Sequence, residues 1–365
     1  MPTYTLPTIE MRGTPRQLGE GHGETLREPI QEFVAHRLDA AQKYLEQRGV
    51  TEQADFESPA SACLEILKQW DPEGYEEHMG VAAGAEVDAA RLYAATNYSD
   101  MRDLVLLSRP ELAGQTAGDE GCTSFALPVQ KTARREVLTG QTWDLHPRDM
   151  QYVYAMHRIP ENGPETWSVT CAGSPTLIGM NEDGVYVGTT NIKINRVRPG
   201  IAYLSLLHRA IRCSDRVAAA TAIAEAPRVA AHTYWLVDAG GAIELECRAD
   251  EHVQRVMDED ALIQTNHCLH DAFAADEAET PSESSLCRLK RATELVDERD
   301  THSVDTIRAM FSDRADDIRS INRYPEDLQY AATNSCVIGI PAARELWACR
   351  GPADQGEWIT LPFGR

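Results

Sequence analysis

The feature that most constrains the fold of this chain is a change of hydrophobic periodicity near residue 120. Before that point, apolar residues recur at three- and four-residue spacing, which is typical of helices. After it, short apolar runs alternate with turn residues, which is typical of strands. The chain has 365 residues, of which 42% are hydrophobic, so it can bury a large core. We therefore expect a helical N-terminal segment followed by a strand-rich remainder.

The N-terminal segment reads as helices with almost no strand pattern. Apolar residues from Leu26 to Leu45 follow helical spacing, Gly49 stops them, and Pro29 indicates a break or a fresh helix start. Two further helices are predicted around 63–70 and 87–95. These patterns indicate a small helical subdomain.

The region after the helices begins with a predicted loop and a predicted hairpin. Residues 109–120, RPELAGQTAGDE, are rich in Gly, Pro, Thr and acidic residues, which predicts a loop. From Cys122 onward, TSFALPV and VLTGQTWD are joined by the charged turn KTARRE, and this order predicts a β-hairpin.

The remaining pattern predicts an α+β protein with antiparallel hairpins. Strands are expected at WSVTCAG, GVYVGTTNI, TYWLVD and AIELECR, the last two joined by a turn at Gly240 and Gly241. Helices are expected over 202–224 and 284–296, and CVIGI and ELWAC form a closing strand pair. A four-layer helix–sheet–sheet–helix sandwich is one solution for this order.

Charge and cysteine usage exclude several functional classes. The formal net charge of −22 opposes binding to nucleic acid and to anionic membrane surfaces, since both need positive charge on the protein. No uncharged apolar run reaches the length of a membrane span. The nine cysteines are scattered without a C-x-x-C pair, which favours reduced thiols over disulfides or a zinc site. We expect a cytoplasmic protein that needs no cofactor.

Cys122 differs from the other cysteines in its position. It stands where the predicted loop ends and the strands begin, with Gly121 before it. Breaking the Gly121–Cys122 bond would free an α-amino group with a pKa of about 7.7 to 8.0. That amine can act as a general base for a thiol whose ordinary pKa is about 8.5. The hypothesis is a nucleophile that becomes N-terminal when the chain is cut.

Four stretches in order carry a resemblance to a known family. They are D-E-G-C-T-S from Asp119, G-Q-T-W-D from Gly140, G-M-N-E-D-G from Gly179 and T-N-H from Thr265. With them the chain resembles the penicillin acyltransferase-like cysteine Ntn hydrolases, which include enzymes that cleave β-alanyl amides. The resemblance runs from about Gly13 to the C-terminus. It implies a four-layer αββα sandwich over 122–365, the β chain, and a helical pro-region over 1–121, the α chain, which stays bound as a heterodimer.

The resemblance also implies roles for individual residues. Cys122 matches the nucleophile, and Asp144 matches the aspartate that orients the thiol and the amine. Asn266 resembles the asparagine whose amide donates to the oxyanion, and Asn191 resembles a second active-site asparagine. Arg323, in S-I-N-R-Y-P, matches a C-terminal arginine of the family.

Two positions depart from the family pattern, and a third is a candidate for substrate binding. Related bile-salt hydrolases have Arg where Gln141 stands, and the penicillin acyltransferases have Asn where Thr142 stands. These differences put the local hydrogen-bond network in question. Arg148 could hold a substrate carboxylate through two hydrogen bonds, although solvent exposure is the default for such a residue.

A histidine-rich stretch invites a metal interpretation that we do not favour. His267, His270 and Asp271 lie close in sequence, yet acyl transfer needs no metal and no further ligand is apparent. Loop or helix-cap histidines are the expected outcome.

These observations favour a self-processing amidohydrolase that cleaves a small-molecule amide through a Cys122 thioester. A second hypothesis is an acyltransferase that passes the acyl group from a thioester, such as an acyl-CoA, or from an amide to an amine. A third is a papain-like thiol hydrolase with an internal histidine, and a fourth is a non-catalytic binding protein that is never cut. Homo-oligomerisation is left open.

Overall fold

Two β-sheets lie face to face in the computed structural model, which describes residues 2–50, 52–107, 121–278, 280–327 and 331–364. Within these residues the larger sheet has eight strands, ordered β1-β4-β5-β6-β7-β8-β9-β10, and the smaller has six, ordered β11-β2-β3-β12-β13-β14. Contacts of β2 with β7 and of β12 with β6 join the two sheets. The predicted loop over 109–120 lies outside the described residues.

The strands and helices have the following bounds. The strands are β1 Thr8–Gly13, β2 Gly121–Leu127, β3 Leu138–Leu145, β4 Val153–Pro160, β5 Thr166–Cys171, β6 Ile178–Asn181, β7 Tyr186–Asn191, β8 His232–Asp238, β9 Gly241–Cys247, β10 His252–Val256, β11 Leu262–Gln264, β12 Ala332–Ile340, β13 Glu345–Arg350 and β14 Ile359–Thr360. The helices are α1 Pro15–Thr25, α2 Arg27–Glu46, α3 Glu57–Trp70, α4 Pro72–Ala85, α5 Ala89–Thr96, α6 Tyr98–Leu107, α7 Tyr203–Ala210, α8 Arg216–Ala224, α9 Asp271–Ala274, α10 Glu283–Asp297 and α11 Val304–Phe311.

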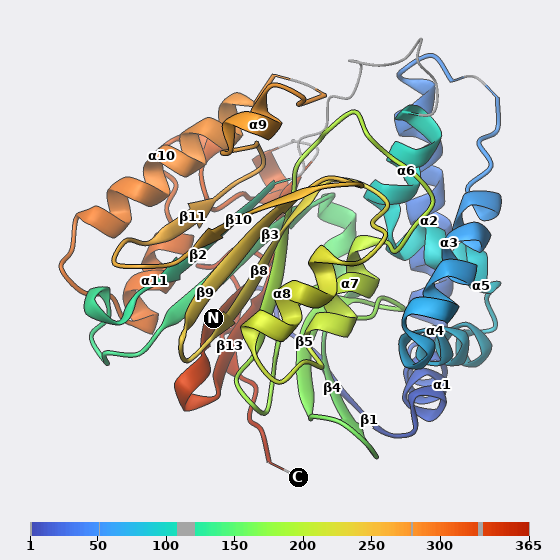
Figure 1. Cartoon of the computed structure of the whole chain (residues 1–365), viewed down its shortest axis with the longest axis horizontal. Coiled ribbons are helices and arrows are strands. Elements are labelled where there is room, and N and C mark those ends of the chain that lie inside the picture. The colour runs from blue at the N-terminus through green and yellow to red at the C-terminus, as the bar shows by residue number, and fades with distance from the viewer. Residues whose placement is uncertain (1, 51, 108–120, 279, 328–330, 365) are drawn as a thin grey trace.

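Helices cover the outer faces of both sheets, which confirms the predicted four-layer αββα sandwich. Helices α10 and α11 pack on strands of the smaller sheet, and α7 and α8 pack on β7, β8 and β9 of the larger one. Figure 1 shows these two helical layers on opposite sides of the strands, with the blue N-terminal helices gathered beside α7. Every residue of β2 and β3 is buried, because both faces of the smaller sheet are covered.

The predicted hairpins are confirmed by the strand register. Strands β2 and β3 pair antiparallel, as do β8 with β9 and β12 with β13. The turn between β8 and β9 places Gly241 at a φ of 137°, a conformation that favours glycine. The G-M-N-E-D-G stretch forms the end of β6 and the turn into β7, as expected from its turn residues.

Two predictions about secondary structure are wrong. The N-terminal segment contains a strand, β1, which pairs parallel with β4 at the edge of the larger sheet. Half of its six residues are exposed and the strand carries little apolar signal, so the partner strand supplies the conformation. The single helix predicted over 202–224 is two helices, because Asp215 caps α8 by accepting from Val217 N and Ala218 N.

Helices α1 and α4 of the N-terminal segment pack unusually closely. A Cβ at Gly19 or Gly23 would collide with backbone atoms of α4, and one at Gly80 or Gly84 with those of α1. Only glycine lets two backbones approach in this way. The expected fresh start near Pro29 is confirmed, since α1 ends before Leu26 and Pro29 lies in the first turn of α2.

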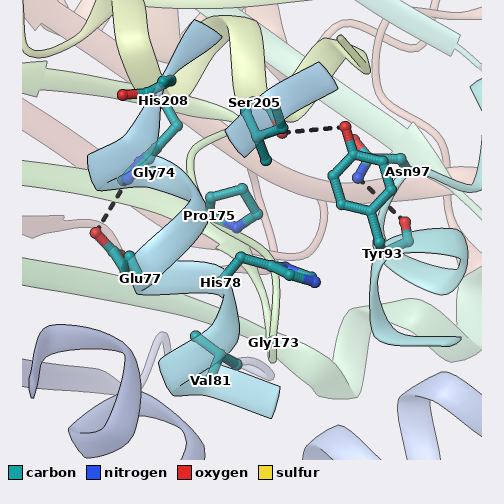
Figure 2. Close-up of a pocket in the computed structure, with 12 residues that line it drawn as sticks. Gly74, Glu77, His78, Val81, Tyr93, Asn97, Gly173, Pro175, Ser205 and His208 are labelled. Atoms are coloured by element: carbon teal, nitrogen blue, oxygen red, sulfur yellow. Dashed lines mark hydrogen bonds and ion pairs between the residues drawn. The ribbon is translucent and has the colours of Figure 1, made fainter. Parts of the chain in front are cut away.

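A hollow of about 410 Å³ lies at the seam between the N-terminal helices and α7. Figure 2 shows Glu77 of α4 reaching His208 of α7, and Tyr93 of α5 reaching Ser205. Glu77 also accepts from Arg158 Nε at 2.6 Å. Burial disfavours the charged form of Glu77, but His208 and Arg158 outweigh it and hold its pKa below the usual range. No helix among the described residues combines the length and apolarity that a membrane span requires.

Candidate active site

Strand pairing brings the predicted cleavage site against the predicted aspartate. In the β2–β3 register, Gly121 lies opposite Asp144 and Cys122 lies opposite Trp143. A Cβ on residue 121 would lie 2.5 Å from Asp144 Oδ2 and 3.1 Å from Arg323 Nη1. Because neither group can move far in this buried setting, glycine is required before Cys122.

The Cys122 side chain lies at the wall of a hollow of about 390 Å³. Four of the predicted site residues line it: Cys122, Asp144, Asn191 and Asn266. The other described residues in the lining are Arg37, Ser99, Trp143, Leu145, Leu177, Thr189, Tyr203 and His232. Both parts of the chain, before and after residue 121, therefore form this catalytic hollow.

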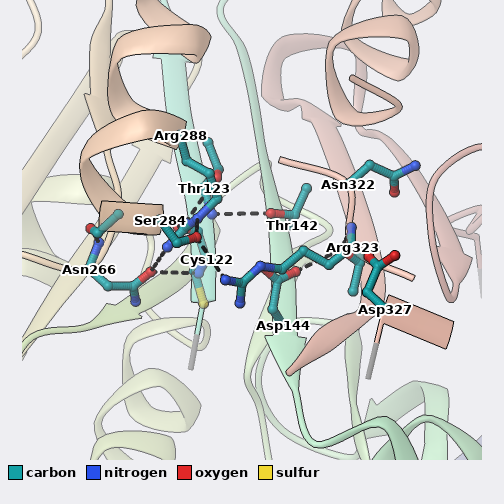
Figure 3. Close-up of polar contacts among 12 residues, drawn as sticks. Cys122, Thr123, Thr142, Asp144, Asn266, Ser284, Arg288, Asn322, Arg323 and Asp327 are labelled. Carbon is teal, nitrogen blue, oxygen red and sulfur yellow. Dashed lines mark hydrogen bonds and ion pairs between the residues drawn. The ribbon is translucent and has the colours of Figure 1, made fainter. Parts of the chain in front are cut away.

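Asn266 links Cys122 to two neighbouring elements. Its Oδ1 accepts from the backbone N of Cys122 at 2.8 Å, and its Nδ2 donates to the backbone oxygen of Asn191 at 3.0 Å. Its own backbone N donates to Ser285 Oγ on α10. Figure 3 shows the amide of Asn266 directed at Cys122. The structure thus brings the two asparagines and the cysteine together.

Arg288, on α10, is a site residue that the sequence analysis missed. Its guanidinium donates to the backbone oxygen of Cys122 and, at 2.9 Å, to Asn266 Oδ1. It is 1% exposed, and burial, with the charge of Arg323, lowers its pKa to about 10. A signal was present in the sequence, because Arg288 occupies the inward face of its helix together with Ser284, Ala292 and Val296.

Asp144 is fully buried between polar groups of β12 and the segment that precedes it. Its Oδ1 accepts from Thr333 Oγ1 at 2.8 Å, and its Oδ2 lies 4.0 Å from Arg323 Nε. Burial raises the pKa of Asp144, and Arg323, Arg288 and the Thr333 hydrogen bond offset only part of that rise. Arg323 is itself held by Ser284 Oγ at 2.7 Å, as Figure 3 shows.

The two departures from the family pattern have structural explanations. The Oγ1 of Thr142 accepts from the backbone N of Thr123 across the hairpin. Gln141 both donates to the backbone oxygen of Thr189 and accepts from its backbone N, so it ties β3 to β7 of the other sheet. These polar side chains therefore support the two strands that carry Cys122 and Asn191.

The remaining candidates lie away from Cys122 or have structural partners. Arg148 is exposed and is not among the described residues that line the catalytic hollow. His267 is buried with its Nδ1 2.8 Å from Ser285 Oγ, and His270 caps α9 by accepting from Ala272 N. Across the described parts of the chain, no three His, Cys, Asp or Glu side chains are grouped so as to hold a metal ion.

Most other cysteines occupy environments that suppress ionisation. Burial raises the pKa of Cys63 to about 11 and that of Cys247 to about 12. A thiol of this kind is unreactive at neutral pH, since the thiolate is the nucleophile. Cys122 instead lies beside the guanidinium of Arg288 and the amide of Asn266.

Comparisons with known proteins identify a family to which this chain is similar. The sequence profile of the family described as acyl-coenzyme A:6-aminopenicillanic acid acyl-transferase matches residues 131–354, a span that includes Asp144, Asn191, Asn266 and both arginines. The 40 kDa form of acyl-coenzyme A:6-aminopenicillanic-acid-acyltransferase from Emericella nidulans is 25% identical over 292 residues, 79% of this chain and 76% of the relative.

Similar solved structures include two hydrolases. Penicillin V acylase from Agrobacterium tumefaciens is 15% identical, with a TM-score of 0.41 over 66% of this chain and 86% of that one. The R18L variant of conjugated bile acid hydrolase from Clostridium perfringens is 12% identical, with a TM-score of 0.45 over 67% of this chain and 97% of that one.

Proposed function

The chain belongs to the acyl-coenzyme A:6-aminopenicillanic acid acyl-transferase family, and we propose that it hydrolyses the C–N bond of a small amide through a thioester on Cys122. One observation carries the proposal. The backbone nitrogen of Cys122 is bonded to Asn266, its preceding residue lies against Asp144, and all three side chains line one hollow. Such a convergence of nucleophile, carboxylate and amide suits acyl transfer.

The first step of the proposal is a cut between Gly121 and Cys122. The Cys122 thiolate adds to the Gly121 carbonyl carbon, the peptide C–N bond breaks, and water hydrolyses the resulting thioester. The backbone nitrogen of Cys122 becomes a primary amine. The departure of Gly121 opens space beside the Asp144 carboxylate, which then faces the new amine. A buried carboxylate stabilises the charged form of that amine.

In the catalytic cycle, the α-amine takes the proton of the Cys122 thiol and the resulting thiolate attacks the substrate carbonyl. The α-ammonium then gives that proton to the leaving amine as the C–N bond breaks, which leaves the thioester. We assign the second N–H of the Asn266 amide to the developing oxyanion, since its first N–H is used by Asn191. Arg288 is a positioning residue, because it holds the Cys122 backbone and Asn266 Oδ1 at once. Water then releases the acid.

The N-terminal piece, residues 1–121, is proposed to remain bound as the partner of 122–365. Buried polar contacts cross from one piece to the other: Arg37 pairs with Asp149, Glu77 pairs with Arg158, and His232 Nε2 lies 2.6 Å from Asp100 Oδ1. Strand β1 also pairs with β4 along its whole length. Removing one partner from a buried ion pair costs about 3–5 kcal/mol, so the two ion pairs resist separation.

Acyl transfer to an amine is the second candidate, and the family membership favours it. The relative from Emericella nidulans is named an acyltransferase. The same Cys122 thioester serves either reaction, and only the acceptor differs. Adding a primary amine to the assay and measuring the ratio of new amide to free acid separates the two.

The test of the cut is the intact mass of purified protein. We expect two fragments, 1–121 and 122–365, in place of the single 40.4 kDa chain, and N-terminal sequencing should place Cys122 first in the larger one. Gly121→Ala should slow the cut, since the new Cβ meets Asp144 Oδ2. A single chain that persists with full amidase activity would refute the proposal.

A further inference from the structure

One wall of the catalytic hollow is polar but has no role in the chemistry proposed above. Arg37, Ser99 and His232 line it. Arg37 lies on α2 and Ser99 on α6, so both precede the proposed cut, and His232 begins β8. The proposed α chain therefore contributes directly to the surface that a substrate would meet.

Arg37 has a buried hydrogen-bond donor that no described residue accepts. Its Nη1 donates to Asp149 Oδ2 at 2.8 Å, and its guanidinium lies 4.1 Å from the ring centroid of Tyr98. Its Nε is buried and has no hydrogen-bond partner among the described residues. A buried N–H left without an acceptor is costly, so such a group in a binding hollow indicates an acceptor brought by the ligand.

His232 has an unpartnered nitrogen in the same lining. Its Nε2 lies 2.6 Å from Asp100 Oδ1, and its ring stacks on Tyr203 with centroids 4.6 Å apart. The Asp100 carboxylate keeps the proton on Nε2, and among the described groups Nδ1 has no partner. Nδ1 accepts a hydrogen bond when the ring is neutral and donates one when it is protonated.

The charges around the hollow favour an oxygen over an ammonium group at this wall. Among the described residues that line the hollow, the charged side chains are Arg37 and Asp144. An added cation would lie next to the Arg37 guanidinium without a carboxylate of its own. A hydroxyl can accept from the Arg37 guanidinium without any change of charge, and a carboxylate adds the attraction of an opposite charge.

We infer that this polar wall selects amides whose acyl group carries a hydroxyl or carboxylate oxygen away from the scissile carbonyl. The oxygen accepts from Arg37 Nε and pairs with His232 Nδ1, so the segment before the cut recognises the acyl group. The inference rests on the proposed function and adds its substrate class. The polar groups that line the seam hollow of Figure 2 differ, because Glu77 and His208 form a hydrogen bond with each other.

The test is a panel of p-nitroanilides that differ only at the far end of the acyl chain. The end group is a methyl, hydroxyl, carboxylate or ammonium, each on chains of three to seven carbons. At one chain length we expect kcat/KM for the hydroxyl or carboxylate compounds to exceed that for the methyl compound by about tenfold or more, with the ammonium compound below methyl. Arg37→Lys, which moves the donor but keeps its charge, and His232→Phe should both reduce this preference.

Lys43→Gln, on the exposed side of the same helix as Arg37, is the matched control and should keep the wild-type preference. Equal rates for all end groups, or a preference for methyl or ammonium, would overturn the inference while leaving the proposed function intact. A preference that survives both substitutions would also overturn it. If the wild-type enzyme cleaves no compound of the panel, the proposed function fails and the inference fails with it.

Discussion

The seam hollow and the catalytic hollow are similar in size but differ in how their polar atoms are used. The seam hollow, about 410 Å³, is lined by groups that bond one another, such as Glu77 with His208. The catalytic hollow, about 390 Å³, is lined by buried groups with polar atoms that no described residue pairs, among them Arg37 Nε and His232 Nδ1. Paired polar groups stabilise a fold, whereas unpaired ones in a hollow are available to a ligand.

This difference predicts that substitutions will have opposite consequences in the two hollows. Substitution of Cys122 should reduce turnover more than stability, and substitution of Glu77 at the seam should reduce stability more than turnover. A substitution that reverses this order at either site would break the comparison.

The largest effect is expected for Cys122→Ala. Without the thiol there is no thioester, so kcat/KM should fall by about 10⁴-fold or more, and the chain should stay in one piece. Amide hydrolysis and intact mass measure the two losses. Cys213→Ala, at a half-buried cysteine in the turn after α7, is the matched control and should retain both properties. Residual turnover above about a hundredth of the wild-type rate would point to a different nucleophile.

The next largest effect is expected at the seam, for Glu77→Gln. The change leaves the buried Arg158 without its carboxylate, which should lower the free energy of unfolding by about 3–5 kcal/mol. The Cys122→Ala background keeps the chain uncut, so urea denaturation can be followed as a unimolecular process. Glu76→Gln, on the exposed face of the same helix, should change stability by about 0.5 kcal/mol or less.

The Glu77 carboxylate should also make stability depend on pH. Because its pKa is lowered in the folded state, its contribution is complete above the unfolded pKa and is lost as the pH falls towards the folded one. The wild-type chain should therefore lose stability on acidification more steeply than the Glu77→Gln variant. Equal slopes for the two proteins would contradict the ion-pair interpretation.

Arg288→Met should reduce kcat by about 10²–10³-fold. The substitution removes the hydrogen bonds to the Cys122 backbone and to Asn266 Oδ1, so the oxyanion donor is no longer held in place. Arg288→Lys keeps the charge but cannot donate to both acceptors with the geometry of a guanidinium. It should therefore recover less than about a tenth of the lost kcat. Lys290→Gln, exposed on the same helix, is the control. A change in KM with kcat preserved would assign Arg288 a structural role instead.

The sandwich could be predicted because several of its strands have a clear sequence pattern. The hairpins at β2–β3 and β8–β9 have apolar runs joined by evident turn residues, and the structure confirms both. Strand β1 was missed because its six residues carry little apolar signal and depend on β4 for their conformation. The glycine-rich α4 gives a weak helical pattern, and its close contact with α1 is a tertiary property that no local pattern encodes.

Site residues that stand at a recognisable position in the sequence could be predicted, whereas residues that packing brings to the site could not. Cys122 follows a glycine at the start of a strand, and Asp144 ends the strand beside it, so both could be chosen from sequence. Arg288 reaches Cys122 from 166 positions away, through the packing of α10 on β2. The polar wall depends on Arg37 and His232, which come from distant parts of the chain and meet only in the folded structure.

The smallest expected effect is a shift in the pH dependence of turnover when the surroundings of Asp144 are changed. Its ionised form is the one that can hold the α-ammonium, and its pKa is raised, so kcat/KM should fall as the pH drops through a value above the ordinary pKa of an aspartate, about 3.9. Arg323 opposes that rise. Arg323→Gln should therefore move this acidic fall in activity to higher pH. If the acidic fall in kcat/KM stays at the same pH in Arg323→Gln, or persists in Asp144→Asn, another group controls it. Asp144 would then serve the fold instead of the chemistry.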